Sequence, residues 1–267
     1  MDVRQPVSRR RFFGGVAATV GAIGLTSSSD LFAQAQAQAP AGTAATATTQ
    51  RFAGSDAEYD KMIKLASNEN NWGPPESVMK AMNGAFKYAN RYGYPDGNVV
   101  EEIAAHHGLK PENVLLSAGS GEILDVVGTT FLQGGKKVVG ADPSYGSVYQ
   151  HATSIKADAI KVPLRKDYSA DIPAMIKAAK DNASQVGFFY LCNPNNPTAV
   201  IVPADEVKQV IEGVPAGMPI LIDEAYHHFV DDPRYTSSVD YIKQGKPVIV
   251  ARTFSKIAAL AAMRIGY

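Results

Sequence analysis

Several side chains that can do chemistry lie directly after runs of apolar residues. Asp223 follows the run 218–222 and begins the segment Asp-Glu-Ala-Tyr. Lys256 ends Arg-Thr-Phe-Ser-Lys after the run 247–251, and Arg264 follows it. A desolvated lysine can attack a carbonyl group or carry a proton, and an arginine can bind a phosphate through two parallel hydrogen bonds. Taken singly, the lysine is also compatible with a solvated charge, and the aspartate with a helix cap.

Two further loops carry candidate binding groups. Ser117-Ala-Gly-Ser-Gly-Glu122 leads into a helical pattern, so its amides and the helix dipole could hold a phosphate. It is neither a Walker loop nor a complete dinucleotide-binding motif, and by itself it is more typical of a tight turn. Asn193-Pro-Asn-Asn-Pro-Thr198 follows the apolar run 186–192, and its simplest interpretation is a rigid turn.

These loops belong to a chain in which strand and helix patterns alternate. The strand-like runs are 137–141, 159–162, 186–192, 218–222 and 247–251, with a further short apolar run at 113–117. The helical patterns are 75–89, 99–107, 122–132, 172–181 and 204–212. Such alternation predicts an α/β fold with a mainly parallel sheet. Ligands of such sheets bind at the carboxyl ends of the strands, where the polar segments are expected to lie.

Taken together, in the order in which they occur along the chain, these polar segments resemble those of the fold-type I pyridoxal-phosphate enzymes. The motifs Asn-Asn-Pro-Thr, Asp-Glu-Ala-Tyr and Arg-Thr-Phe-Ser-Lys…Arg-Ile-Gly-Tyr are similar to those of class I/II aminotransferases of the histidinol-phosphate aminotransferase kind, from about Lys64 to Tyr267. The resemblance implies a three-layer α/β/α fold and pyridoxal 5'-phosphate as the cofactor. It also implies transamination between an amino acid, or an amino-acid phosphate ester, and a 2-oxo acid.

The resemblance also implies roles for individual residues. Lys256 matches the lysine that holds the cofactor aldehyde as an aldimine, and Asp223 matches the acid that faces the pyridine nitrogen. Asn196 and Tyr226 match the pair that binds the phenolic oxygen of the ring. The other matches are Tyr145, which stacks on the ring; Ser120, Gly121, Thr253 and Arg264, which bind the phosphate; Tyr94, which reaches the phosphate in the neighbouring subunit; and Asn68 and Trp72, on the substrate side.

The sequence departs from the family pattern in three respects. Ala199 stands where glycine is usual, and Gly121 stands where an acid is common. The sequence stops at Tyr267, before the region that completes the small domain in the family, so we expect that C-terminal domain to be missing. A decarboxylase or a carbon–sulfur lyase on the same fold, and a non-catalytic fragment that binds pyridoxal phosphate, remain as alternatives.

The N-terminal residues predict a targeting segment. Ser8-Arg9-Arg10-Arg11-Phe12-Phe13 is a twin-arginine pattern, and the apolar stretch 16–25 after it is too short to span a membrane comfortably. We therefore expect residues 1–39 to be a signal peptide for twin-arginine export to the periplasm, without a stable membrane anchor. Residues 40–60 are then a flexible leader rich in Ala and Thr, and residues 61–267 the cofactor-binding domain.

Charge and composition narrow the choice of partners. The chain has 26 Lys and Arg against 26 Asp and Glu, which gives no electrostatic reason to expect nucleic acid. Cys192 is the single cysteine and is expected in the core, and no Cys/His cluster has zinc-site spacing, so no metal is expected. The match of Tyr94 to a residue that serves the neighbouring subunit implies a homodimer acting on small molecules.

Overall fold

The computed structural model describes residues 54–92 and 98–267. The chain divides into two compact units, Met1–Met62 and Ile63–Tyr267. In the first unit, the described residues include the helix α3 (Asp56–Asp60), which begins with a reciprocal capping box between Ser55 and Glu58. The predicted signal peptide, most of the predicted leader and Tyr94 lie outside the described residues.

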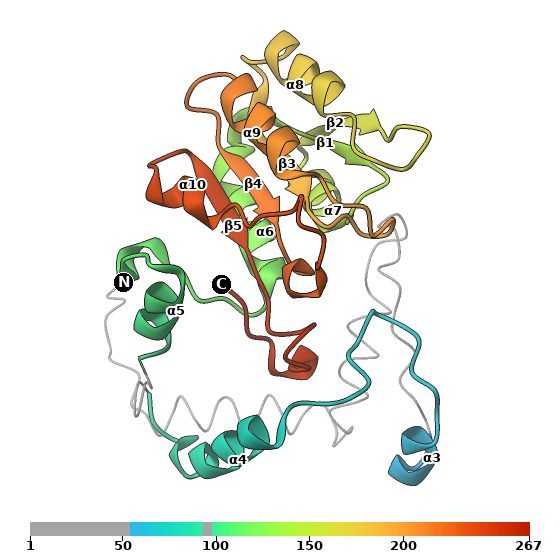
Figure 1. Cartoon of the computed structure of the whole chain (residues 1–267), viewed down its shortest axis with the longest axis vertical. Coiled ribbons are helices and arrows are strands. Elements are labelled where there is room, and N and C mark those ends of the chain that lie inside the picture. Colours follow the sequence, from blue (N-terminus) through green and yellow to red (C-terminus); the bar gives the residue numbers. More distant parts are fainter. Residues whose placement is uncertain (1–53, 93–97) are drawn as a thin grey trace, which may run out of the picture. The chain divides into compact units, whose positions relative to one another are not determined.

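Five parallel strands form a sheet in the second unit, in the order β2-β1-β3-β4-β5 (Figure 1). They are β1 (Lys137–Asp142), β2 (Asp158–Pro163), β3 (Val186–Cys192), β4 (Ile220–Asp223) and β5 (Val248–Ala251). Each corresponds to a predicted run. β4 and β5 begin directly after Pro219 and Pro247, because proline has no N–H to donate to the sheet.

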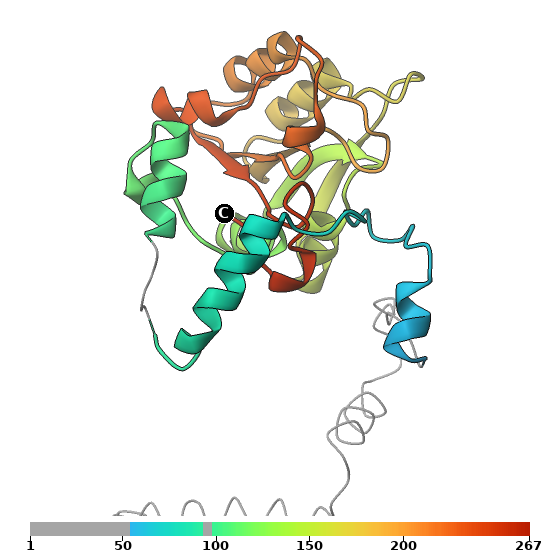
Figure 2. The same cartoon turned by 60° about the horizontal axis from the view of Figure 1, so that its bottom comes forward.

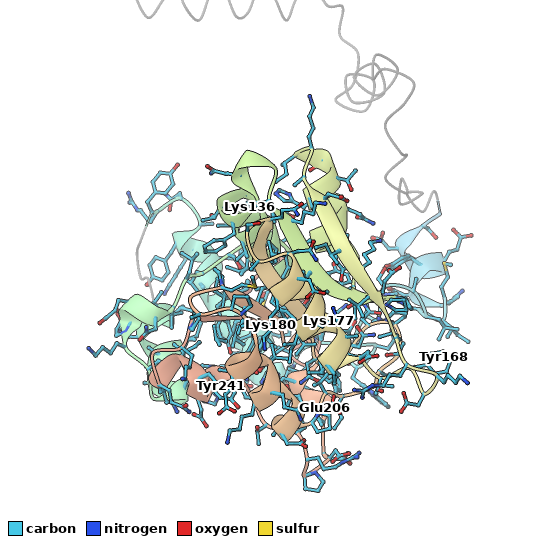
Figure 3. The ribbon with its side chains drawn as sticks, turned by 90° about the horizontal axis from the view of Figure 1, so that it is seen from above. Lys136, Tyr168, Lys177, Lys180, Glu206 and Tyr241 are labelled. Carbon is cyan, nitrogen blue, oxygen red and sulfur yellow. The ribbon has the colours of Figure 1, made fainter. Side chains whose placement is uncertain are left out.

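Helices cover both faces of the sheet, so the predicted three-layer α/β/α fold is confirmed. Figure 1 shows α8 (Ile172–Asp181) and α9 (Ala204–Gly213) on one side and α6 (Ser120–Phe131) on the other, the side where α7 (Ser147–Ser154) also packs. Figure 3 looks onto the first side, with the labelled Lys177, Lys180 and Glu206 on its helices. Alternate residues of β3 enter the two apolar cores, Phe189 and Leu191 one, Phe188 and Tyr190 the other.

The remaining helices are short or lie before the sheet. They are α4 (Glu76–Ala85), α5 (Val99–His107) and α10 (Val239–Lys243), and the single 3-10 turns are η1 (Phe86–Tyr88), η2 (Pro111–Asn113), η3 (Gln133–Gly135), η4 (His227–Phe229) and η5 (Ala261–Met263). No helix among residues 54–92 and 98–267 is long and apolar enough to cross a membrane.

The run 113–117 does not form a strand. Within it, Ser117 pairs with Gly266 in an isolated antiparallel bridge, and Gly266 also bridges to Thr253. The backbones of Arg252 and Tyr267 exchange two hydrogen bonds of 2.7 and 3.0 Å. The residues up to Tyr267 therefore connect the loop before α6 with the loop after β5, as Figure 2 shows near the labelled C-terminus.

Candidate active site

The carboxyl ends of the central strands open into a cavity of about 540 Å³. β3 brings Cys192 to its wall, β4 brings Asp223, and the loop after β5 brings Lys256. With the exception of Trp72, every predicted site residue that the structure describes lines this cavity: Asn68, Ser120, Gly121, Tyr145, Asn196, Asp223, Tyr226, Thr253, Lys256 and Arg264. Segments distant in the sequence thus meet where parallel sheets bind ligands.

Two predicted residues are not placed at the cavity. The side chain of Trp72 is 96% exposed, and its backbone amide donates to Asn70 Oδ1 in a local turn. Asn68, four residues earlier, does line the cavity. The substrate-side segment therefore contributes Asn68, whereas Trp72 projects into solvent. Tyr94 lies outside the described residues.

The end of the cavity at α6 is built to receive an anion. α6 begins at Ser120, and the first amides of a helix have no partners within it and carry the positive end of its dipole. Arg264 reaches the same place, where its guanidinium donates to the Ala118 carbonyl at 3.1 Å. Gly119, at φ +79°, permits this approach, because a Cβ there would collide with the guanidinium.

Hydroxyl groups adjoin this positive end. Thr253 Oγ1 donates to Ser255 Oγ at 2.8 Å, and Ser255 Oγ lies 3.4 Å from Arg264 Nη1. Both residues line the cavity. Helix amides, a guanidinium and hydroxyl groups are the donors that bind phosphate in proteins.

Asp223 is a buried acid at the end of β4, with only 2% of its surface exposed. Its Oδ1 accepts a hydrogen bond from the Ala225 amide at 3.1 Å. Burial raises the pKa of this carboxyl from 3.8 to about 6, more than the Ala225 hydrogen bond and the positive charge of Lys256 lower it. A positively charged ligand group beside Asp223 would stabilise its ionised form.

Lys256 is half-buried between Asp223 and the N-terminal segment of the unit. Its Nζ donates to the carbonyls of Ser67 and Asn68 at 2.8 and 3.2 Å and lies 5.7 Å from the centre of the Tyr226 ring. Desolvation lowers the pKa of this amine and the Arg264 charge acts in the same direction, and together they outweigh the carboxylates of Glu69 and Asp223, which raise it. Both effects favour the neutral amine that nucleophilic attack requires.

Tyr226 completes the wall beside Lys256. Its hydroxyl accepts a hydrogen bond from Asn68 Nδ2 at 2.9 Å, and burial raises its pKa. The phenol therefore keeps its proton at neutral pH, and with one acceptor position in use, its O–H remains able to donate. Asn196 lines the cavity as well, so a ligand oxygen there would meet a hydroxyl and an amide.

Three contributions to this site were not predicted from the sequence. Cys192 belongs to the core, as expected, but also lines the cavity, because it lies opposite Asp223 in the sheet register. Ser255 joins Thr253 to Arg264. Glu224 and Arg252 form a buried ion pair immediately behind the site. The motifs contained Glu224, Arg252 and Ser255, and Cys192 ended an apolar run, but the pairing of these residues depends on strand register that no local pattern displays.

The cavity therefore has an anion-binding end, a deep carboxylate and an amine. A flat ring fits this set if it carries an anionic group at one end, a positive charge facing Asp223 and a carbonyl within reach of Lys256. Among the described residues there is no cluster of three or more His, Cys, Asp or Glu that could hold a metal ion.

Comparisons with known proteins agree with this arrangement. The family model for class I and II aminotransferases matches residues 60–267. A histidinol-phosphate aminotransferase from Caldicellulosiruptor saccharolyticus is 37% identical over 212 residues, which cover 78% of this chain and 57% of that protein. One from Maricaulis maris is 37% identical over 210 residues, which cover 77% of this chain and 56% of that protein.

A solved structure gives the same result. Histidinol-phosphate aminotransferase from Sinorhizobium meliloti, in complex with pyridoxal-5'-phosphate, is 26% identical and superposes with a TM-score of 0.68 over 84% of this chain and 63% of that one. This chain thus spans little more than half the length of the curated relatives that it matches. The family match covers most of the chain, and the chain belongs to the class I and II aminotransferases.

Proposed function

We propose that this protein binds pyridoxal 5'-phosphate in the cavity at the ends of β3, β4 and β5. We propose further that, as a whole protein, it transfers the amino group of an amino acid to a 2-oxo acid. The observation that carries the proposal is that Asp223, Lys256 and Arg264 line one cavity, with the anion-binding start of α6 at its edge. The family membership and the names of the relatives support it.

The residues present fit this cofactor. The start of α6, Thr253 and Arg264 would hold its phosphate, and Asn196 and Tyr226 would donate to its phenolic oxygen. Tyr145, at the cavity wall, would lie against the ring. When bound, pyridoxal phosphate supplies a carbonyl carbon for an amine and a ring that withdraws electrons from the substrate Cα.

Asp223 would hold a proton on the ring nitrogen. It can do so only as an anion, and the positive nitrogen would in turn lower the raised pKa of the buried carboxyl. Each pKa unit gained in this way corresponds to about 1.4 kcal/mol of interaction. The amine of Lys256, with its lowered pKa, would bind the cofactor carbonyl. Once the substrate amine takes its place there, the released lysine amine would carry a proton to or from the substrate Cα.

The test is reduction with borohydride, followed by mapping of the lysine that carries the cofactor. We expect the label on Lys256 and its loss in Lys256→Ala, while the exposed Lys246→Ala serves as the control. A label on another lysine would contradict the site. Turnover that depends on a 2-oxo acid distinguishes transamination from decarboxylation or carbon–sulfur cleavage on the same fold, and binding without turnover would indicate a non-catalytic fragment.

We also propose that the protein is a homodimer with shared sites, in line with the match of Tyr94 to a residue that serves the neighbouring subunit. Mixing Tyr94→Phe subunits with Lys256→Ala subunits should restore a fraction of intact sites. A monomer in light scattering, or no recovery of cofactor binding or activity in the mixture, would contradict sharing.

Finally, we propose that the N-terminal twin-arginine segment directs export to the periplasm. The proposal is supported by the order of the charged, apolar and small-residue stretches within residues 1–39. Replacing Arg9 and Arg10 with lysine should retain the protein in the cytoplasm, as measured by cell fractionation. Normal delivery of that variant to the periplasm would contradict this proposal.

A further inference from the structure

Behind the cavity lies an ion pair that is almost wholly buried. Glu224 is 1% exposed and Arg252 is 3% exposed. Arg252 donates from Nη2 and Nε to Glu224 Oε2 at 2.7 and 3.1 Å. The same oxygen accepts from Ser237 Oγ at 2.9 Å, and Oε1 accepts from the Ser238 amide at 2.6 Å. Both carboxylate oxygens of Glu224 are therefore hydrogen-bonded, as a buried charge requires.

The pair directly adjoins the two functional strand ends. Glu224 follows Asp223, and its amide donates to the Ala251 carbonyl at 2.9 Å. Asp223 lines the cavity, whereas Glu224 contacts Ser237 and Ser238, which precede α10. Successive side chains of an extended segment point to opposite sides. The two acids thus face different surroundings, one a ligand cavity and the other a cation.

We propose that Arg252 is a positioning residue that neutralises Glu224 and thereby allows Asp223 to carry its negative charge toward the ligand in the cavity. The inference rests on the proposed function, because the ligand in question is the cofactor ring. It gives a role to the buried guanidinium of Arg252, which lines neither the cavity nor the predicted phosphate site.

The charges around Asp223 support this assignment. Tyr145, Tyr190, Tyr226 and Cys192 interact with it, but burial raises the pKa of each, so they are neutral at pH 7. Of the charged groups, Glu224 raises the pKa of Asp223 and Lys256 lowers it, and Glu69 and Arg264 also line the cavity. Glu224 raises the pKa of Asp223 even with Arg252 in place. Without Arg252, an uncompensated buried anion would lie one peptide bond away.

The experiment measures the pKa of Asp223 directly, in the cofactor-free protein, from the carboxyl ¹³C shifts of labelled aspartate assigned with Asp223→Asn. Arg252→Met should raise this pKa by about one unit or more, a tenfold change in the ionisation constant. Glu224→Gln, which leaves the cation unopposed, should lower it. The double variant Glu224→Gln/Arg252→Met should return it close to the wild-type value.

The opposite directions of the two expected pKa shifts distinguish an electrostatic role of Arg252 from a purely structural one. A purely structural role predicts that both single variants shift the pKa in the same direction, or not at all, and either result would overturn the inference. Arg234→Met removes a guanidinium from an exposed ion pair with Asp232 and should leave Asp223 unchanged. If Arg252→Met does not fold, Glu224→Gln and the double variant still decide the sign.

Cofactor titration by fluorescence then keeps this inference separate from the proposed function. A wild-type protein that does not bind pyridoxal phosphate would contradict the proposed function, while the carboxyl shifts would still report the coupling. If it binds, Arg252→Met should weaken binding by up to about tenfold for each unit of pKa gained when the titration is done at pH 5, below the pKa of Asp223, and the double variant should recover it. Weakening without recovery would overturn the inference.

Discussion

Gly266 packs against Gly119 so closely that a Cβ atom on Gly266 would lie 2.5 Å from the Gly119 carbonyl carbon. The same Cβ would lie 2.5 Å from the Ser120 amide nitrogen and 2.8 Å from the Arg252 carbonyl oxygen. All three neighbours are backbone atoms, which cannot rotate away as a flexible side chain can, and the Arg252 carbonyl also accepts a hydrogen bond from the Tyr267 amide. The position of the first amides of α6 therefore depends on a residue at the other end of the unit.

We expect Gly266→Ala to destabilise the protein by about 1–3 kcal/mol, the usual range for overpacking, and to weaken cofactor binding. The matched control is Gly84→Ala in α4, because a Cβ there has no heavy atom within 4 Å and the residue does not line the cavity. Denaturant unfolding and cofactor titration measure the two effects. Equal behaviour of the two variants would show that the contact with Gly119 does not shape the anion site.

A second prediction concerns the buried acid. The pKa of Asp223 is about 6 in the folded protein against an ordinary 3.8, so between these values the native state holds the proton more tightly than the unfolded chain. The stability of the cofactor-free protein should therefore fall as the pH rises from about 4 to about 6. Two pKa units correspond to roughly 3 kcal/mol. Above pH 6 this cost is constant.

Asp223→Asn removes that cost. We expect the cofactor-free variant to be more stable than wild type at pH 7.5, by up to roughly 3 kcal/mol, with the difference disappearing near pH 4. The same variant should bind the cofactor weakly, because a neutral amide cannot hold the ring proton. The exposed Asp231→Asn is the control. A wild-type protein that is more stable than Asp223→Asn at pH 7.5 would contradict the cost assigned to burial.

The sheet was predictable because buried parallel strands are short, continuous apolar runs bounded by turn residues. β3 coincides with its predicted run, 186–192, because both of its faces are buried. α7 was missed because Ser147-Val-Tyr-Gln-His-Ala-Thr-Ser154 contains few strong helix formers. Its stability comes from burying Val148, Tyr149 and Ala152, which is a tertiary effect.

In the candidate site, too, some features could be predicted from the sequence and others could not. Side chains at strand ends were predictable from their types and order, because parallel strands bring their carboxyl ends together. The pairing of Glu224 with Arg252 was not, since it depends on the register of β4 against β5. Nor was the solvent-exposed orientation of Trp72, which is set by the local turn around Asn70.

Ala199 supplies a third prediction. It adopts φ +58°, in the left-handed region, at the position where the sequence departs from the glycine of the family pattern. A residue with a Cβ costs about 1–2 kcal/mol there, whereas glycine costs about 0.5–1 kcal/mol through the unfolded chain. We therefore expect Ala199→Gly to stabilise the protein by about 0.5–1 kcal/mol.

The matched control for this change is Ala204→Gly, at the start of α9, where glycine should destabilise by about 0.5–1 kcal/mol. Urea unfolding of both variants gives the comparison. If Ala199→Gly destabilises as much as Ala204→Gly, the loop 195–200 is not under the backbone strain that the positive φ indicates.

The last prediction concerns the stability of the folded protein at acidic pH. His107 shares a 2.9 Å hydrogen bond with the hydroxyl of Tyr267, and burial, followed by the positive charge of Arg252, lowers its pKa to about 4. The native state therefore binds this proton less tightly than the unfolded chain, and stability is lost as the pH falls from 6.5 toward 4. His107→Gln can keep the hydrogen bond but cannot become charged, so its melting temperature should fall less across this interval than that of wild type.

The exposed His106→Gln is the control and should follow the wild-type curve. Because burial also lowers the pKa of His227 to about 4, the double variant His107→Gln/His227→Gln should flatten the profile further. Parallel curves for wild type and His107→Gln would mean that the imidazole takes up its proton in the folded protein as readily as in the unfolded chain.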